Sequence, residues 1–293
     1  MRIGIDGRLW NESGVGRYTR NLVAQLQVLD KKNQYVLFVL GKDYHSIKHN
    51  NWKVVKVDIR WHTLAEQLKF PSVLNQENLD LVHFPYFSVP IFYNRPFVVT
   101  IHDLILHHFP TGQASTLPLP FYSAKIVGYK FVISQAAKRA KKIITVSNAT
   151  KQEIVDHLHV DKDKVVVTYE GVDQKISNRS QNTKYEILNT KYFLYVGNAY
   201  PHKNLERMLT AFASIKYKVL SIKLVLVGKE DFFYRRLKEK VQKMRLEKQI
   251  VFYGEATDEE LKNLYKNAKA LIMPSLMEGF GLPGLEAMQN GCL

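Results

Sequence analysis

The sequence predicts an α/β fold with parallel sheets, divided between two domains. Short apolar runs alternate with longer segments of helical periodicity along the chain. Most of these runs are β-branched or aromatic and apolar throughout, as in parallel strands buried on both faces. The alternation stops at a polar stretch, residues 174–189, and restarts at Tyr192. We therefore predict domains at 1–173 and 190–293, joined by a linker at 174–189.

The predicted strands follow one another with room for a helix between most neighbours, which favours parallel pairing. In the first domain they are Arg2–Ile5, Tyr35–Leu40, Trp52–Val57, Leu81–Phe84, Phe97–Ile101, Lys142–Val146 and Val165–Tyr169. In the second domain they are Tyr192–Val196, Lys223–Val227, Ile250–Phe252 and Ala270–Met273.

The predicted helices carry apolar residues spaced by three and four. One of them, Asp258–Asn267, follows Thr257 and has Glu260 three residues after that threonine, the pattern of a capping box. The others are Arg17–Leu29, Asn148–Leu158 and Asn204–Ile215. The last helical segment stops at Asn290-Gly291, so we expect the second domain to be incomplete at its C-terminal end.

Composition places the chain among globular proteins. Its 293 residues can form two buried cores, and 46% hydrophobic with 24% charged residues argues against a disordered or fibrous chain. The chain has 42 Lys and Arg and 27 Asp and Glu residues, which gives a net charge of +15. This charge either favours anionic partners or belongs to a solvated basic surface with no specific partner. A single cysteine, Cys292, excludes an intramolecular disulfide, and the N-terminus lacks a signal peptide's apolar core. We expect a cytoplasmic protein.

Two glycine-bearing turns follow predicted strands, where open α/β sheets bind ligands. Ser13-Gly14-Val15-Gly16-Arg17 opens a helix and could present backbone N–H groups to a phosphate, or be a plain tight turn. It lacks the third glycine of a dinucleotide-binding motif. In Val196–Asn204, Lys203 stands near the predicted start of a helix and could meet a diphosphate. The alternative is a surface lysine.

A third segment places glycines between two carboxylates, Glu278 and Glu286, eight positions apart. Pro283 suits the first turn of a helix, which would put Glu286 about one turn inside it. The loop could hold an anion or sugar hydroxyls, and a carboxylate can accept hydrogen bonds from a ribose diol. The alternative, a turn with two solvated glutamates, is disfavoured by the interleaved apolar Phe280, Leu282 and Leu285.

His102 follows the apolar run Phe97–Ile101, which places its imidazole at the carboxyl end of a buried strand. A lone histidine is more often structural than catalytic. No pattern of His, Glu or Cys predicts a metal site, and no nucleic-acid-binding signature is present.

These segments, in this order, resemble glycosyltransferase family 4, a family of retaining enzymes with the GT-B fold of two Rossmann-like domains facing across a cleft. The resemblance spans nearly the whole chain and is strongest in Glu278–Glu286, which is similar to the family's element of two glutamates separated by seven residues. The supporting matches are Ser13–Gly16, Thr145–Asn148, Glu170–Asp173, Val196-Gly197 with Lys203-Asn204, and Gly254, Leu261, Tyr265 and Ala268.

The resemblance implies roles for residues of both domains. Lys203 would bind the donor diphosphate, and Gly14 and Gly16 would bring backbone N–H groups to it. Glu278 would lie beside the donor sugar, Glu286 would hold the ribose, and His102 would approach the reacting sugar. The remaining implied donor-binding residues are Asn198, Gly279, Phe280, Gly281 and Leu282. The chain departs from the family at Asn198, where many members carry arginine, and at Glu170, where asparagine is common.

The implied reaction is retaining transfer of a hexose from a nucleotide-diphosphate sugar, GDP-mannose or a UDP-sugar, to a glycan or lipid-linked glycan. The donor is a substrate, and no metal or other cofactor is required. Cleavage builds negative charge on the leaving diphosphate, which Lys203 and helix N-termini would stabilise. A Rossmann-fold oxidoreductase is disfavoured by the missing glycine motif. Two alternative interpretations remain open: that the chain is a glycosyltransferase-like fragment without activity, or that it is a basic binding protein without catalysis.

The acceptor side shows one further pattern. The apolar stretch Thr116–Tyr122 precedes a helical segment rich in basic residues, which could rest on the anionic inner face of a membrane. The alternative is an ordinary surface helix packed on the first domain. The basic residues are Lys125, Lys130, Lys138, Arg139, Lys141 and Lys142. We expect no nucleic-acid partner.

Overall fold

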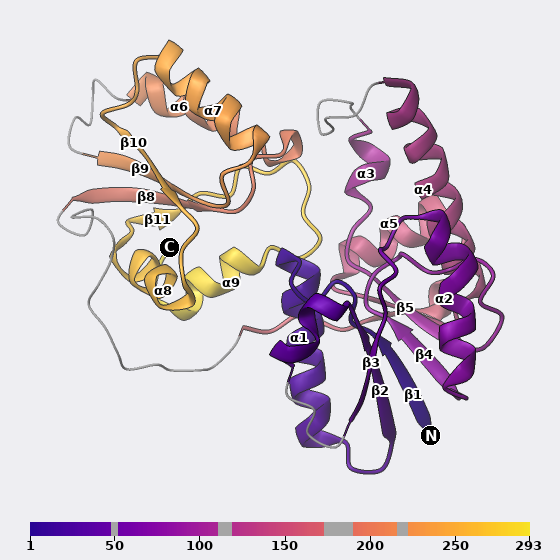
Figure 1. Ribbon diagram of the computed structural model, residues 1–293. Coiled ribbons are helices and arrows are strands. Elements are labelled where there is room, and N and C mark those ends of the chain that lie inside the picture. The colour runs from indigo at the N-terminus through magenta and orange to yellow at the C-terminus, as the bar shows by residue number, and fades with distance from the viewer. Residues whose placement is uncertain (48–51, 111–118, 173–189, 216–221) are drawn as a thin grey trace. The chain divides into compact units, whose positions relative to one another are not determined.

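The computed structural model describes residues 1–47, 52–110, 119–172, 190–215 and 222–293 (Figure 1). These residues form two compact units. The N-terminal unit holds Met1–Pro110 and Leu117–Glu170, and the C-terminal unit holds Gly171–Leu293. The linker predicted at 174–189 lies outside the described residues. Each unit is an α/β sandwich with its own parallel sheet.

The sheet of the N-terminal unit has the strand order β3-β2-β1-β4-β5-β6-β7, all parallel. The strands are β1 (Arg2–Asp6), β2 (Gln34–Val39), β3 (Lys53–Lys56), β4 (Leu81–Phe84), β5 (Phe97–Ile101), β6 (Lys142–Thr145) and β7 (Val165–Val167). The helices are α1 (Ser13–Leu29), α2 (Leu64–Gln76), α3 (Ile105–His108), α4 (Leu119–Arg139) and α5 (Asn148–Leu158), with 3-10 turns η1 (Gly41–Ser46) and η3 (Lys162–Lys164). The strand order reverses between β1 and β4, the point where such sheets bind ligands.

Alternate residues of β2 enter two cores on opposite faces of this sheet. Leu37 and Val39 pack with Val23 of α1 on one face. Val36 and Phe38 pack with Phe70 of α2 on the other, which α4 and α5 also cover (Figure 1). Burial on both faces explains why these strands are apolar throughout rather than alternating.

The C-terminal unit has the strand order β10-β9-β8-β11, again all parallel. Its strands are β8 (Lys191–Val196), β9 (Ile222–Val227), β10 (Ile250–Gly254) and β11 (Ala270–Leu271). Its helices are α6 (Leu205–Ile215), α7 (Phe232–Lys243), α8 (Asp258–Asn267) and α9 (Leu282–Gln289), with the 3-10 turn η5 (Pro201–Lys203). Helices α6 and α7 pack on one face of the sheet and α8 and α9 on the other (Figure 1). Here the order reverses between β8 and β11.

All predicted strands are present, with ends that differ by a few residues. The capping box of α8 is confirmed, because the Thr257 hydroxyl accepts from the Glu260 amide while the Glu260 carboxylate accepts from the Thr257 amide. Pro283 lies in the first turn of α9, as predicted. Within the described residues, no helix is both long enough and apolar enough to cross a bilayer.

The glycines of Ser13–Arg17 open helix α1, as predicted, but the helix begins at Ser13 rather than at the predicted Arg17, so they lie inside its first turn. The apolar spacing starts only at Tyr18, and glycine is a poor helix former, so periodicity did not detect this first turn. Packing explains the glycine at position 16. A Cβ there would lie 2.5 Å from the carbonyl oxygen of Trp10 and 2.7 Å from that of Leu9.

Candidate active site

The clearest candidate site lies at the switch point of the C-terminal sheet. Strands β8 and β11 are neighbours there, and their carboxyl ends lead into residues 197–204 and 272–281. Two hydrogen bonds join these segments. The Leu276 amide donates to the His202 carbonyl at 2.8 Å, and the Asn204 side-chain amide donates to the Pro274 carbonyl at 3.1 Å. Residues 70 or more positions apart are thus held together.

Lys203 and Glu278, predicted separately from two motifs, meet at this point. The Lys203 ammonium lies 2.6 Å from Oε1 of Glu278, and the Ser275 hydroxyl donates to the same oxygen at 2.6 Å. Their side chains are 16% and 28% exposed, so the pair is partly shielded but open to a ligand. Lys203 is the last residue of η5, and Asn204 follows it in the left-handed region (φ 58°). Burial, and then the Lys203 charge, lowers the pKa of His202 to about 4.

The glycine segment leads directly into α9. Gly281 is the N-cap of this helix and lies in the left-handed conformation (φ 87°), which glycine adopts without strain. Glu286 lies one turn further on, as predicted. It accepts a hydrogen bond at 3.0 Å from the hydroxyl of Tyr265, a buried residue of α8. Glu286 is therefore oriented by the protein rather than simply solvated.

Backbone contacts hold the segment after β8. Gly197 adopts φ 150°, and its carbonyl accepts from the Tyr234 hydroxyl at 2.8 Å. The Asn198 carbonyl accepts from Tyr195 at 2.7 Å, while the Asn198 side chain is exposed. A Cβ at Gly228 would lie only 2.1 Å from the Gly197 carbonyl oxygen, so this approach requires glycine.

His102 follows β5 in the N-terminal unit, as predicted, and both of its ring nitrogens face oxygen atoms. Nε2 lies 2.9 Å from the Pro85 carbonyl oxygen, which can only accept a hydrogen bond. Nδ1 lies 3.4 Å from Oε1 of Glu170. The ring of Tyr18 packs edge-on against the imidazole, with centroids 4.8 Å apart. These contacts fix the plane of the ring.

The first turn of α1 belongs to the same unit as His102. The residue before it, Glu12, makes no side-chain cap to the helix. A Cβ at Gly14 would meet nothing within 4 Å, whereas Gly16 faces the preceding loop closely. Gly14 therefore lies on the open side of the helix start and Gly16 on its packed side.

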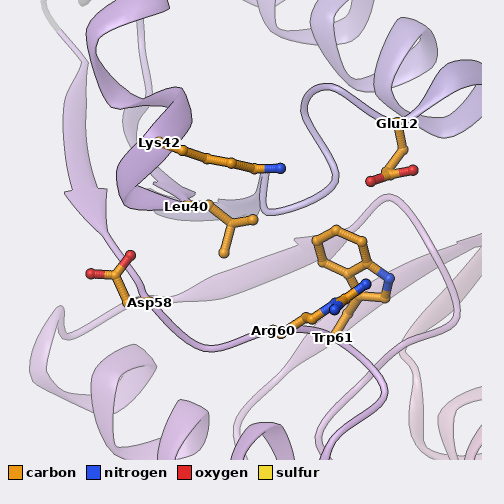
Figure 2. A pocket seen from close by; sticks show the side chains of 6 residues that line it. All are labelled: Glu12, Leu40, Lys42, Asp58, Arg60 and Trp61. Carbon is orange, nitrogen blue, oxygen red and sulfur yellow. The ribbon is translucent and has the colours of Figure 1, made fainter.

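A pocket of about 500 Å³ opens in the N-terminal unit beside the ends of β2 and β3 (Figure 2). Lys42 extends into it from η1, and Arg60 lies against Trp61, with its guanidinium carbon 5.7 Å from the ring centroid. The lining residues are Glu12, Leu40, Lys42, Asp58, Arg60 and Trp61. The pocket thus combines both signs of charge with an aromatic ring.

The structure brings Lys203 and Glu278 into contact. Glu286 follows on α9, where it is held by Tyr265, and Gly279, Phe280, Gly281 and Leu282 lie between the two glutamates in the chain. His102, Gly14 and Gly16 belong to the other unit, and their joining into one site with the first group stays a prediction. The sequence analysis did not predict three contacts: that of Ser275 with Glu278, that of Tyr265 with Glu286, and that of Glu170 with His102. Two of them carried a signal: Tyr265 as a supporting match to the family, and Glu170 as a departure from the family pattern.

Two family descriptions match the chain. "Glycosyltransferase Family 4" matches residues 13–175, more than half of the chain, and "Glycosyl transferases group 1" matches residues 177–293. The chain belongs to glycosyltransferase family 4. Its two Rossmann-like units are those of the family's GT-B fold.

Relatives of this family member include two mannosyltransferases. The O-antigen chain mannosyltransferase RfbU of Salmonella typhimurium is 29% identical over 78% of this chain, and the match spans 59% of RfbU. O-antigen chain mannosyltransferase B of Escherichia coli is 27% identical over 95% of this chain and 77% of that protein. Among solved structures, HepE of Anabaena in complex with UDP-glucose has a TM-score of 0.70 at 16% identity, covering 100% of this chain and 79% of HepE.

Proposed function

We propose that this protein transfers a hexose from a nucleotide-diphosphate sugar to a glycan or lipid-linked glycan with retention of configuration. The observation that carries the proposal is the meeting of Lys203 and Glu278 at the switch point of the C-terminal sheet. Glu286 is held nearby along the same segment by Tyr265. A cation and two oriented carboxylates at a ligand-binding sheet edge suit a diphosphate, a sugar and a ribose.

Lys203 supplies positive charge for the leaving diphosphate. Negative charge grows on that group as the anomeric bond breaks, and a prepositioned ammonium stabilises it without reorganisation. Before the donor binds, Glu278 holds the lysine in place and is itself held by the Ser275 hydroxyl. A diphosphate would take over the ammonium and leave Glu278 to accept hydroxyl donors from the sugar. Because Lys203 and helix N-termini supply this charge, we propose that no metal is needed for the reaction.

The donor is a GDP- or UDP-linked hexose. Mannosyl transfer is the activity named for both relatives, and HepE was solved with UDP-glucose. We favour mannose as the sugar, with glucose and galactose as the competitors to test. Closure of the two domains over the donor would exclude water and limit hydrolysis.

His102 would lie beside the reacting sugar, supplied by the N-terminal unit. The Pro85 carbonyl and Glu170 fix its ring, so its position does not depend on the substrate. Glu170 stands where asparagine is common in the family, and its carboxylate adds a negative charge behind the imidazole. We propose that this charge compensates for positive character building on the sugar.

The pocket in Figure 2 suits the acceptor. The ring of Trp61 offers a flat apolar surface for the C–H face of a sugar ring. Lys42, Arg60 and Glu12 can hydrogen-bond to hydroxyl groups around it. A pocket with both donors and acceptors fits a glycan better than it fits a purely anionic ligand.

We also propose that α4 rests on an anionic membrane surface. Its side chains Phe121, Val127 and Phe131 are 69%, 68% and 53% exposed, and exposed Lys125 and Lys130 lie among them. Apolar side chains beside lysines favour a negatively charged lipid surface. The predicted apolar tip is only partly described: Tyr122 is buried, and residues 111–118 lie outside the described ranges. Arg139 is engaged within the fold by the carbonyls of Ile91 and Tyr93.

Sedimentation with vesicles tests this membrane proposal. The wild type should pellet with phosphatidylglycerol vesicles at low salt, and the variant Val127→Ser/Phe131→Ser should pellet less. Pelleting with neutral vesicles to the same extent, or none with anionic ones, would contradict it.

The transfer reaction is tested by incubating the protein with a panel of labelled nucleotide sugars and following transfer or slow donor hydrolysis. We expect transfer or hydrolysis to be faster with one donor than with the others. Lys203→Ala should weaken the binding of that donor about 10- to 100-fold, the cost of about 1.5–3 kcal/mol for a charged hydrogen bond. Lys266→Ala, on the exposed side of α8, is the matched control. Absence of both reactions across the panel, with no donor binding, would favour a protein without catalysis.

A further inference from the structure

Three side chains of types that can bind a metal ion converge on the surface of the N-terminal unit, apart from the candidate site. They are His108 at the end of α3 and Glu153 and His157 on α5. Each offers one ligand atom, and the three atoms all lie within 4.8 Å of one another. Glu153 and His157 are four positions apart on a helix, which puts them on one face.

One separation in this cluster is close to that between two ligands of a small metal ion. Two ligands of a tetrahedral zinc ion, each at about 2.0–2.1 Å, lie about 3.3 Å apart. Nε2 of His157 lies 3.4 Å from Oε2 of Glu153, and Nε2 of His108 contacts the same oxygen. The two imidazoles meet edge-on, with centroids 4.9 Å apart. Both nitrogens therefore lie beside one carboxylate oxygen.

We propose that His108, Glu153 and His157 bind Zn²⁺ through two imidazole nitrogens and one carboxylate oxygen, with water completing the coordination. Two nitrogens and one oxygen suit a borderline divalent ion better than calcium or magnesium, which prefer oxygen ligands. The side chains are 34%, 32% and 41% exposed, so the ion can enter from solvent. The site is structural, separate from the donor site proposed above.

The ion would hold α3 and α5 together, and both helices adjoin His102. Helix α3 starts three residues after His102, and its first amide donates to Asp103. In the first turn of α5, the Thr150 hydroxyl donates to the His102 carbonyl at 3.4 Å. An ion bound only when α3 and α5 are together stabilises this arrangement by mass action.

The test titrates Zn²⁺ into the full chain, without a polyhistidine tag, against a chromophoric chelator at pH 7.5. We expect one equivalent per chain. His108→Gln and His157→Gln should each weaken binding at least tenfold, and the double variant should abolish the site. His45→Gln, an exposed histidine on η1, is the matched control and should bind as the wild type does. Binding should weaken from pH 7.5 to pH 6, because protons compete for the imidazoles.

Equal Zn²⁺ affinity in the wild type and the double variant would overturn the proposal, as would no binding by the wild type. Far-UV circular dichroism of the metal-free variants checks that they remain folded, which we expect because all three residues are on the surface. Visible absorption of bound Co²⁺ would report the coordination number. No sugar donor enters the assay, so its failure would leave the proposed glycosyl transfer intact.

Discussion

Arg8 is a buried guanidinium, 1% exposed, whose charge is held by two carboxylates. Its Nη2 lies 2.7 Å from Asp6 and 2.6 Å from Glu66, and its Cζ lies 3.8 Å over the ring of Phe70. Glu66 in turn accepts from the Ser88 hydroxyl at 2.9 Å. The network ties the carboxyl end of β1 to α2, and so supports the loop that leads to Gly14 and Gly16.

Glu66→Gln should therefore destabilise the protein by about 3 kcal/mol, because it leaves a buried positive charge with one carboxylate fewer. Urea unfolding at pH 7 measures the change. The matched control is Glu77→Gln, which loses pairs with the more exposed Arg2 and Lys53 and should cost less than about 1 kcal/mol. Equal losses in the two variants would contradict this account.

His83, on the central strand β4, is buried and bonded to the Thr100 hydroxyl at 2.8 Å. Burial, with a smaller effect of His102, lowers its pKa to about 4, against about 6.5 in an unfolded chain. Between these values the unfolded chain binds a proton that the folded protein does not. The stabilisation is fully present above pH 6.5 and is lost as the pH falls toward 4. Burial also lowers the pKa of His107 and His202 to about 4.

We expect the free energy of unfolding to fall between pH 7 and pH 5, with about 2 kcal/mol of the loss due to His83. In His83→Gln, whose amide can still bond to Thr100, the loss should be smaller by that amount. His45→Gln should keep the full pH dependence. Urea titrations at the two pH values provide the measurement, and an unchanged pH dependence in His83→Gln would refute the assignment.

Helix α1 shows how one element serves packing and a predicted ligand at once. Gly16 faces the carbonyls of Leu9 and Trp10 too closely for any side chain, while Gly14 faces open space. Both glycines lower the intrinsic stability of the helix, and only Gly16 has a packing reason to be there. The openness at Gly14 agrees with its predicted role as a backbone donor to the diphosphate.

The two glycines form a matched pair for mutation. Gly16→Ala should destabilise the protein by about 1–3 kcal/mol through overpacking against the loop backbone. Gly14→Ala should leave stability unchanged or raise it by up to about 1 kcal/mol. Thermal unfolding compares the two variants, and a larger loss for Gly14→Ala would show that the helix start is packed differently.

At the scale of the molecule, the two units have separate hydrophobic cores. One pair of cores lies on the two faces of the seven-stranded sheet, and a second pair on the faces of the four-stranded sheet. Each unit can therefore unfold as its own cooperative block. All three tryptophans, Trp10, Trp52 and Trp61, are in the N-terminal unit.

Tryptophan fluorescence should accordingly report unfolding of the N-terminal unit alone, whereas far-UV circular dichroism reports both. A nucleoside diphosphate binds the C-terminal unit in our proposal. Adding UDP or GDP should raise the denaturant midpoint seen by circular dichroism and leave the fluorescence midpoint less changed. Coincident transitions that shift together would show that the units unfold as one.

The sequence by itself determined the parallel α/β class, the strands and the segment Glu278–Glu286 as a candidate for ligand binding. Strands such as β2 are apolar on both faces and helices such as α8 carry their own caps, so local pattern suffices for them. Only the tertiary structure decided that Lys203 pairs with Glu278, that Tyr265 orients Glu286, and that Glu170 stands behind His102. These contacts join residues far apart in the chain. They depend on which strands become neighbours in each sheet, and no local spacing encodes that order.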